Sequence, residues 1–69
     1  MENTLYLKQI GVKVRKARLA RRISASKLCK KCSIEMHTVY AIEQGKVNPK
    51  LLTLVEIASA MKMDVKEFL

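Results

Sequence analysis

Apolar residues recur along the first half of the chain at spacings of three and four, which is the pattern of one face of an α-helix. The first such face predicts a helix over about residues 5–21 and comprises Leu7, Ile10, Val14 and Ala17. Ser24 is a favourable N-cap for a short second helix, whose inward side comprises Ala25, Leu28, Cys29 and Cys32. Residues 5–32 are therefore predicted to form two helices joined by a short turn.

A third short helix is predicted over about residues 35–44. Val39 and Ile42 are its inward positions, and Gly45 is the residue type that commonly follows the end of a helix. The step from Asn48 to Pro49 then imposes an extended turn, because proline disfavours the helical conformation in the residue before it.

The C-terminal part predicts one more full helix and a short final one. Over about residues 50–61 the positions expected to be buried are Leu51, Leu54, Val55, Ala58 and Met61. Asp64 can cap a last turn that contains Val65, Phe68 and Leu69. The pattern thus predicts an all-α fold, a compact bundle of five short helices, in a single domain that spans residues 1–69.

The charge of the chain is concentrated in its first 50 residues. These carry 12 basic and 3 acidic residues, a net charge of +9, whereas residues 51–69 have a net charge of −1. Such a field favours a polyanion such as nucleic acid, although a solvated face or an acidic partner remains an alternative. No apolar stretch is long enough to cross a bilayer and no signal-peptide core is present, so we expect a soluble cytoplasmic protein without a membrane partner.

Little in the sequence suggests catalysis or metal binding. Cys29 and Cys32 form a CxxC pair, but zinc needs four ligands and His37 is the only histidine. We expect the two cysteines to be reduced core residues, with redox sensing or an intermolecular metal as the alternatives. A chain of this size offers no obvious pocket, acid/base pair or nucleophile, so we expect no enzyme activity, no cofactor and no metal.

The arrangement of the second and third helices, with a tight break at Ser33 and Ile34, resembles a helix-turn-helix. The stretch from residue 10 to residue 69 resembles the Cro/C1-type, or Xre, family of phage and bacterial repressors. The matching positions are Gly11, Arg18, Ser24, Leu28 and the run Ile42-Glu43-Gln44-Gly45-Lys46-Val47-Asn48-Pro49, close to the signature I-E-x-G-x-x-x-P. The resemblance implies a lambda repressor-like fold and sequence-specific binding of double-stranded DNA by a transcription regulator, most simply a homodimeric repressor.

The family position of the third helix implies that its outward side chains contact DNA bases. A helical wheel supports this, since Val39 and Ile42 occupy the inward side. The candidate base-contacting residues are Met36, His37, Thr38, Tyr40 and Ala41. The resemblance also implies a structural ion pair between Arg18 on the first helix and Glu43 on the third.

Phosphate contacts are implied at the start of the second helix and in the loop after the third. The candidates are Ser24, Ala25 through its main chain, Gln44, Lys46 and Asn48. Three residues depart from the usual family pattern: Ala25 replaces a common Gln, Ser33 replaces a frequent Gly, and Glu35 replaces a Ser or Thr N-cap.

Some apolar residues belong neither to the predicted core nor to the predicted DNA-binding surface. Leu5, Val12 and Leu19 are seven residues apart, nearly opposite the core face of the first helix, and are expected in solvent or against a partner. The C-terminal part has an apolar excess at Leu52, Ile57 and Met63 that offers a second possible interface. These features leave open a different function, a protein-interaction module such as the antitoxin of a toxin–antitoxin pair.

Overall fold

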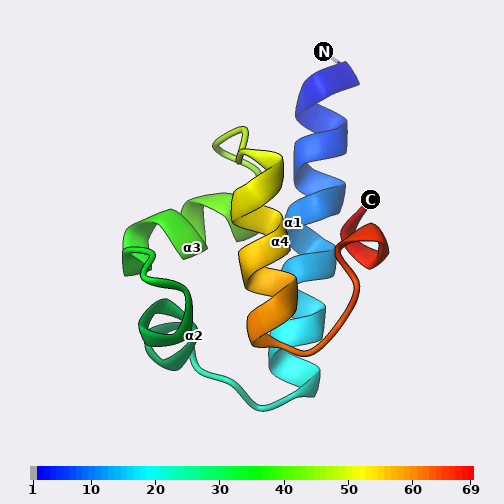
Figure 1. Cartoon of the computed structure of the whole chain (residues 1–69). Coiled ribbons are helices and arrows are strands. Elements are labelled where there is room, and N and C mark those ends of the chain that lie inside the picture. The colour runs from blue at the N-terminus through cyan, green and yellow to red at the C-terminus, as the bar shows by residue number, and fades with distance from the viewer. Residues whose placement is uncertain (1) are drawn as a thin grey trace.

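The computed structural model describes residues 2–69, with side chains from Thr4 onward. It contains four α-helices and one 3-10 helix (Figure 1): α1 (Glu2–Ala20), α2 (Ala25–Cys32), α3 (Met36–Glu43), α4 (Leu51–Ala60) and η1 (Val65–Phe68). No strand occurs within residues 2–69, so the predicted all-α class is confirmed. No helix in this range is both long enough and apolar enough to span a membrane.

Of the five short helices predicted, four are α-helices, and the last segment winds as a 3-10 helix instead. Asp64 caps it by accepting a hydrogen bond from the main-chain N–H of Lys66 at 3.0 Å. The main-chain bonds from Glu67 to Asp64 and from Leu69 to Lys66 each join residues three apart, the spacing of a 3-10 helix. This short turn buries the side chain of Phe68 in the core.

The helix ends follow the chemistry of their capping residues. The hydroxyl of Ser24 accepts a hydrogen bond from the main-chain N–H of Lys27 at 3.1 Å and so begins α2. Ser33 ends α2 in the left-handed conformation, with φ of 56°, where an L side chain is disfavoured. Gly45 follows α3 with φ of 72°, a conformation that glycine adopts without strain.

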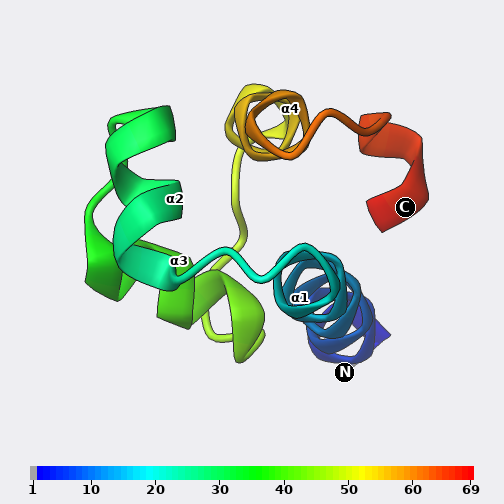
Figure 2. The ribbon, with the colours of Figure 1, turned by 90° about the horizontal axis from the view of Figure 1, so that it is seen from below.

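The helices enclose one small core. In Figure 2, α2 and α3 lie on one side of the molecule, and α1 and η1 on the other. Helix α1 packs against α3 and η1, α2 packs against α3 and α4, and α4 packs against η1. The buried core residues are Val14, Ala25, Leu28, Cys32, Val39, Ile42, Leu54, Ile57, Ala58, Met61 and Phe68.

Part of the burial predicted for the C-terminal residues is wrong. Leu51 and Val55, expected inside, are 58% and 38% exposed. Ile57, predicted as surface excess, is fully buried, and Met63 packs partly buried against the core. The side of α4 that faces the core is narrower than predicted and comprises Leu54, Ile57, Ala58 and Met61. Leu51 and Val55 lie at the edge of this side and are therefore exposed to solvent.

Helix α1 approaches α3 at a glycine. A Cβ atom added to Gly11 would lie 2.5 Å from the carbonyl oxygen of Glu43 and still closer to that of Ile42. Any larger residue would push α1 away from the C-terminal turn of α3. Gly11 therefore fixes the distance between α1 and the helix that the helix-turn-helix arrangement presents to solvent.

Candidate nucleic-acid interface

Helix α3 has one face in the core and one in solvent. Val39 and Ile42 point inward and are almost completely buried, as predicted from their spacing. Met36, His37 and Tyr40 are exposed, whereas Thr38 and Ala41 are half-buried. Three of the five candidate base-contacting residues are thus exposed, and the other two lie at the margin between core and solvent.

The charged groups at the start of α3 are exposed. The Nε2 atom of His37 lies 3.7 Å from the Oε1 atom of Glu35, and both side chains are more than three-quarters in solvent. Glu35 occupies the N-cap position but makes no capping hydrogen bond with its side chain. The carboxylate therefore leaves the first N–H groups of α3 open while placing a negative charge beside the exposed imidazole.

Arg18 and Glu43 form an ion pair that links α1 to α3. The Nε atom of Arg18 donates to Oε2 of Glu43 at 2.6 Å, and Nη2 donates to Oε1 at 3.1 Å. The side chains are only 8% and 2% exposed. The hydrogen bonding of its guanidinium to the Glu43 carboxylate is the main cause that raises the pKa of Arg18, which stays positively charged.

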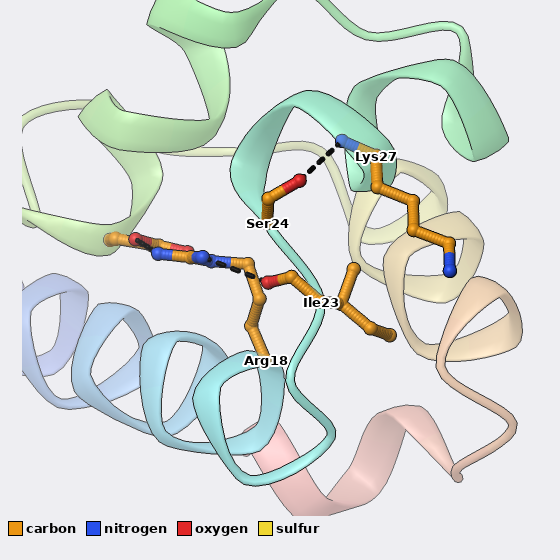
Figure 3. A network of polar contacts seen from close by, with 5 residues as sticks. Arg18, Ile23, Ser24 and Lys27 are labelled. Atoms are coloured by element: carbon orange, nitrogen blue, oxygen red, sulfur yellow. Dashed lines mark hydrogen bonds and ion pairs between the residues drawn. The ribbon is translucent and has the colours of Figure 1, made fainter.

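The same guanidinium also fixes the segment that leads into α2. Its Nη1 atom donates to the main-chain carbonyl of Ile23 at 3.0 Å, one residue before the Ser24 cap (Figure 3). The nearby Arg21 donates to the carbonyl of Met61 at 3.0 Å and joins the end of α1 to the end of α4. These contacts to main-chain oxygens were not predictable, because side-chain spacing carries no information on carbonyl positions.

The candidate phosphate-binding residues fall into two groups. Ser24 and Ala25 lie at the start of α2, where the first main-chain N–H groups of a helix have no partner within it. The side chain of Ala25 is buried, so only its main chain can face a ligand. The second group lies in or beside the loop after α3 and is exposed: Gln44, Lys46 and Asn48.

The two cysteines lie on the inner side of α2. Cys32 is buried and Cys29 is half-buried, and both are free thiols. Burial raises the pKa of the Cys32 thiol, which keeps it protonated and weakly nucleophilic at neutral pH. No cluster of three or more His, Cys, Asp or Glu side chains suited to a metal occurs in the part of the chain that the structure describes.

An outward helix supported by a second helix across a tight turn defines this protein as a helix-turn-helix DNA-binding protein. The family model described as helix-turn-helix, HTH_3, matches residues 14–68. The chain belongs to this family, the Cro/C1-type or Xre family of DNA-binding transcription regulators. A comparison with curated proteins finds no match.

Two solved structures share the fold. The restriction-modification controller protein C.AhdI from Aeromonas hydrophila superposes with a TM-score of 0.88 at 24% identity, over 91% of this chain and 96% of that one. An HTH_3 family transcriptional regulator from Vibrio cholerae gives a TM-score of 0.89 at 23% identity, over 96% of this chain. The chain spans only 37% of the length of the second protein.

Proposed function

We propose that this chain is a single-domain, sequence-specific DNA-binding protein that represses transcription as a homodimer. The observation that carries the proposal is the division of α3 into a buried face and a face that exposes Met36, His37 and Tyr40. A helix held in this way fits the major groove, and bound protein would block access of polymerase or of another factor. A regulatory role is compatible with the fold shared with a restriction-modification controller.

The side chains on α3 suit a particular set of base contacts. His37 can donate to or accept from the N7 and O6 atoms of purines, and Met36 can pack on thymine methyl groups. Thr38 and Ala41 border this surface, and Ala41 can also contact a thymine methyl. No arginine or glutamine on this face forms the strong bidentate contacts to guanine or adenine, so DNA shape contributes to the choice of site.

Phosphates on both sides of the groove would fix the position of α3. The start of α2 supplies Ser24 and the main-chain N–H of Ala25, and the loop after α3 supplies the other three candidates: Gln44, Lys46 and Asn48. Only Lys46 among them carries a charge, so it supplies the salt-dependent part of this group's contribution.

The exposed part of α4 is the surface that we assign to dimerisation. Leu51, Leu52 and Val55 are all exposed on this helix, and the region around them has little net charge. Dimers of helix-turn-helix proteins place two recognition helices about 34 Å apart, one turn of DNA. Leu51 and Val55 therefore replace the buried Ile57 and the half-buried Met63 as expected interface residues, and Leu52 is retained.

Selection of bound sequences from a random duplex library at about 0.15 M salt tests the proposal, because nonspecific phosphate contacts are weakened at that ionic strength. The proposal expects an enriched palindrome whose half-sites are one helical turn apart. A single unpaired motif would support specific binding by a monomer and contradict the homodimer. No enrichment at all would contradict sequence-specific binding.

A second candidate function is a protein-interaction module, such as the antitoxin of a toxin–antitoxin pair. It is favoured by Leu5, Val12 and Leu19, which are 58%, 47% and 51% exposed along one line of α1. Replacement of Leu5 and Val12 by Gln separates the two functions. If this variant selects the same palindrome as the parent, the DNA-binding function is supported. If neither the parent nor the variant selects any sequence from the library, the interaction module is favoured.

A further inference from the structure

Helix α1 meets the loop after α3 at a second glycine. A Cβ atom added to Gly45 would lie 2.8 Å from both the Cα and the Cγ atoms of Lys8 and 2.9 Å from its main-chain nitrogen. The aliphatic stem of Lys8 therefore passes directly over Gly45. Gly45 is buried, whereas Lys8 is exposed, so the stem covers the glycine and the ammonium group reaches solvent.

This contact places the main chain and the Cγ atom of Lys8 against Gly45, the residue that precedes Lys46, the charged residue proposed to bind phosphate. Residues 44–50 contain no acidic side chain, and Glu43 is already bound by Arg18. Of the ion pairs among side chains from Thr4 onward, none involves Lys8 or Lys46. Two lysines from distant parts of the sequence therefore flank Gly45, and neither forms an ion pair among the described side chains, an arrangement that a phosphate group stabilises.

The part of α1 that carries Lys8 is also suitably placed to contact DNA. In Figure 2, α3 and the N-terminal half of α1 lie on the lower side of the molecule, and the loop after α3 runs from this side to α4 on the opposite side. The N-terminal turns of α1 project beyond the other helices in Figure 1. A duplex seated on α3 would continue past the loop toward this part of α1.

We propose that Lys8 binds a phosphate of the DNA backbone beside the one bound by Lys46, so that α1 extends the DNA-binding surface beyond the helix-turn-helix. The inference rests on the proposed function, because it requires a duplex on the outer face of α3. Gly45 makes the site possible, since only a residue without a Cβ lets the stem of Lys8 pass this close to the loop.

The test measures binding of a fluorescently labelled random-sequence duplex across a series of salt concentrations. The variants are Lys8→Gln, Lys46→Gln and the double variant. Lys13→Gln is the matched control, because Lys13 is an exposed lysine of the same helix about 140° around its axis from Lys8. Loss of one phosphate contact lowers the log–log salt slope by about 0.9. Between about 0.05 M and 0.2 M salt, the parent should lose about 3.5-fold more affinity than Lys8→Gln.

The expected result is a lower slope for Lys8→Gln and for Lys46→Gln, additive loss in the double variant, and the parental slope for Lys13→Gln. Lys8→Arg should retain the parental slope. Thermal melts should coincide for all the single variants, which would distinguish a phosphate contact from a role of Lys8 in stabilising the end of α3. A slope that falls for Lys46→Gln but not for Lys8→Gln would overturn this inference alone. A parent protein that binds no duplex would overturn it together with the proposed function.

Discussion

The inner and outer faces of α3 are subject to different physical demands. Val39, Ile42 and Glu43 on the inner side are buried and are constrained by packing, by the approach of Gly11 and by the Arg18 guanidinium. Met36, His37 and Tyr40 on the outer side touch solvent, and folding places no comparable demand on them. Substitutions on the inner face should therefore act on stability, whereas those on the outer face should act on DNA binding.

The largest expected effect is on the inner face. Glu43→Gln leaves the Arg18 guanidinium buried without its anionic partner, which should cost about 3 kcal/mol of unfolding free energy. Urea or thermal unfolding measures this loss, with Glu67→Gln on the exposed side of η1 as the control expected to match the parent. A melt of Glu43→Gln within a degree or two of the parent would contradict a stabilising role for the ion pair.

A smaller change in unfolding free energy, of opposite sign, is expected for a substitution at the turn that leads into α3. Ser33 adopts φ of 56°, so Ser33→Gly should remove the strain of a left-handed L residue and stabilise the fold by about 1 kcal/mol. Ser26→Gly on the exposed side of α2 should instead destabilise it, because glycine is unfavourable within a helix. If both variants lose stability, the strain assigned to the turn is absent.

A loss of stability of similar size is expected for the two cysteines on the inner side of α2. Conversion of both Cys29 and Cys32 to Ala removes little volume and should cost about 1 kcal/mol. DNA affinity should be the same under oxidising and reducing conditions, because the raised pKa of Cys32 disfavours its reactive thiolate. Peroxide that shifts the binding isotherm of the parent but not of the double variant would reveal a redox switch instead.

Elements whose positions follow from periodicity and capping could be predicted from the sequence. Ser24, Gly45 and the inward pair Val39 and Ile42 have local signals, and each lies where those signals indicate. The final turn was predicted less well, because the difference between α and 3-10 winding depends on how Phe68 reaches the core. Local patterns therefore predict the position of a helix more reliably than whether it winds as an α-helix or as a 3-10 helix.

Features that depend on how helices approach one another could not be predicted. Leu51 and Val55 belong to an apolar stripe, but their exposure depends on which side of α4 the neighbouring helices cover. Lys8 gives no signal in the sequence, because its contact with the loop after α3 exists only through the crossing at Gly45. The family resemblance located the ion pair of Arg18 with Glu43, but not the bond from Arg18 to the carbonyl of Ile23.

We expect the outer face of α3 to distinguish DNA sequences, whereas the loop after α3 contacts only the DNA backbone. Titration of His37→Ala and Lys46→Ala against a preferred duplex and a random one, at several salt concentrations, tests it most directly. His37→Ala should lose about 1–3 kcal/mol on the preferred duplex and much less on the random one. Lys46→Ala should weaken both equally and lower the salt slope by about 1. Equal losses on both duplexes for His37→Ala would contradict the claim for that residue and leave Met36 and Tyr40 to carry the specificity.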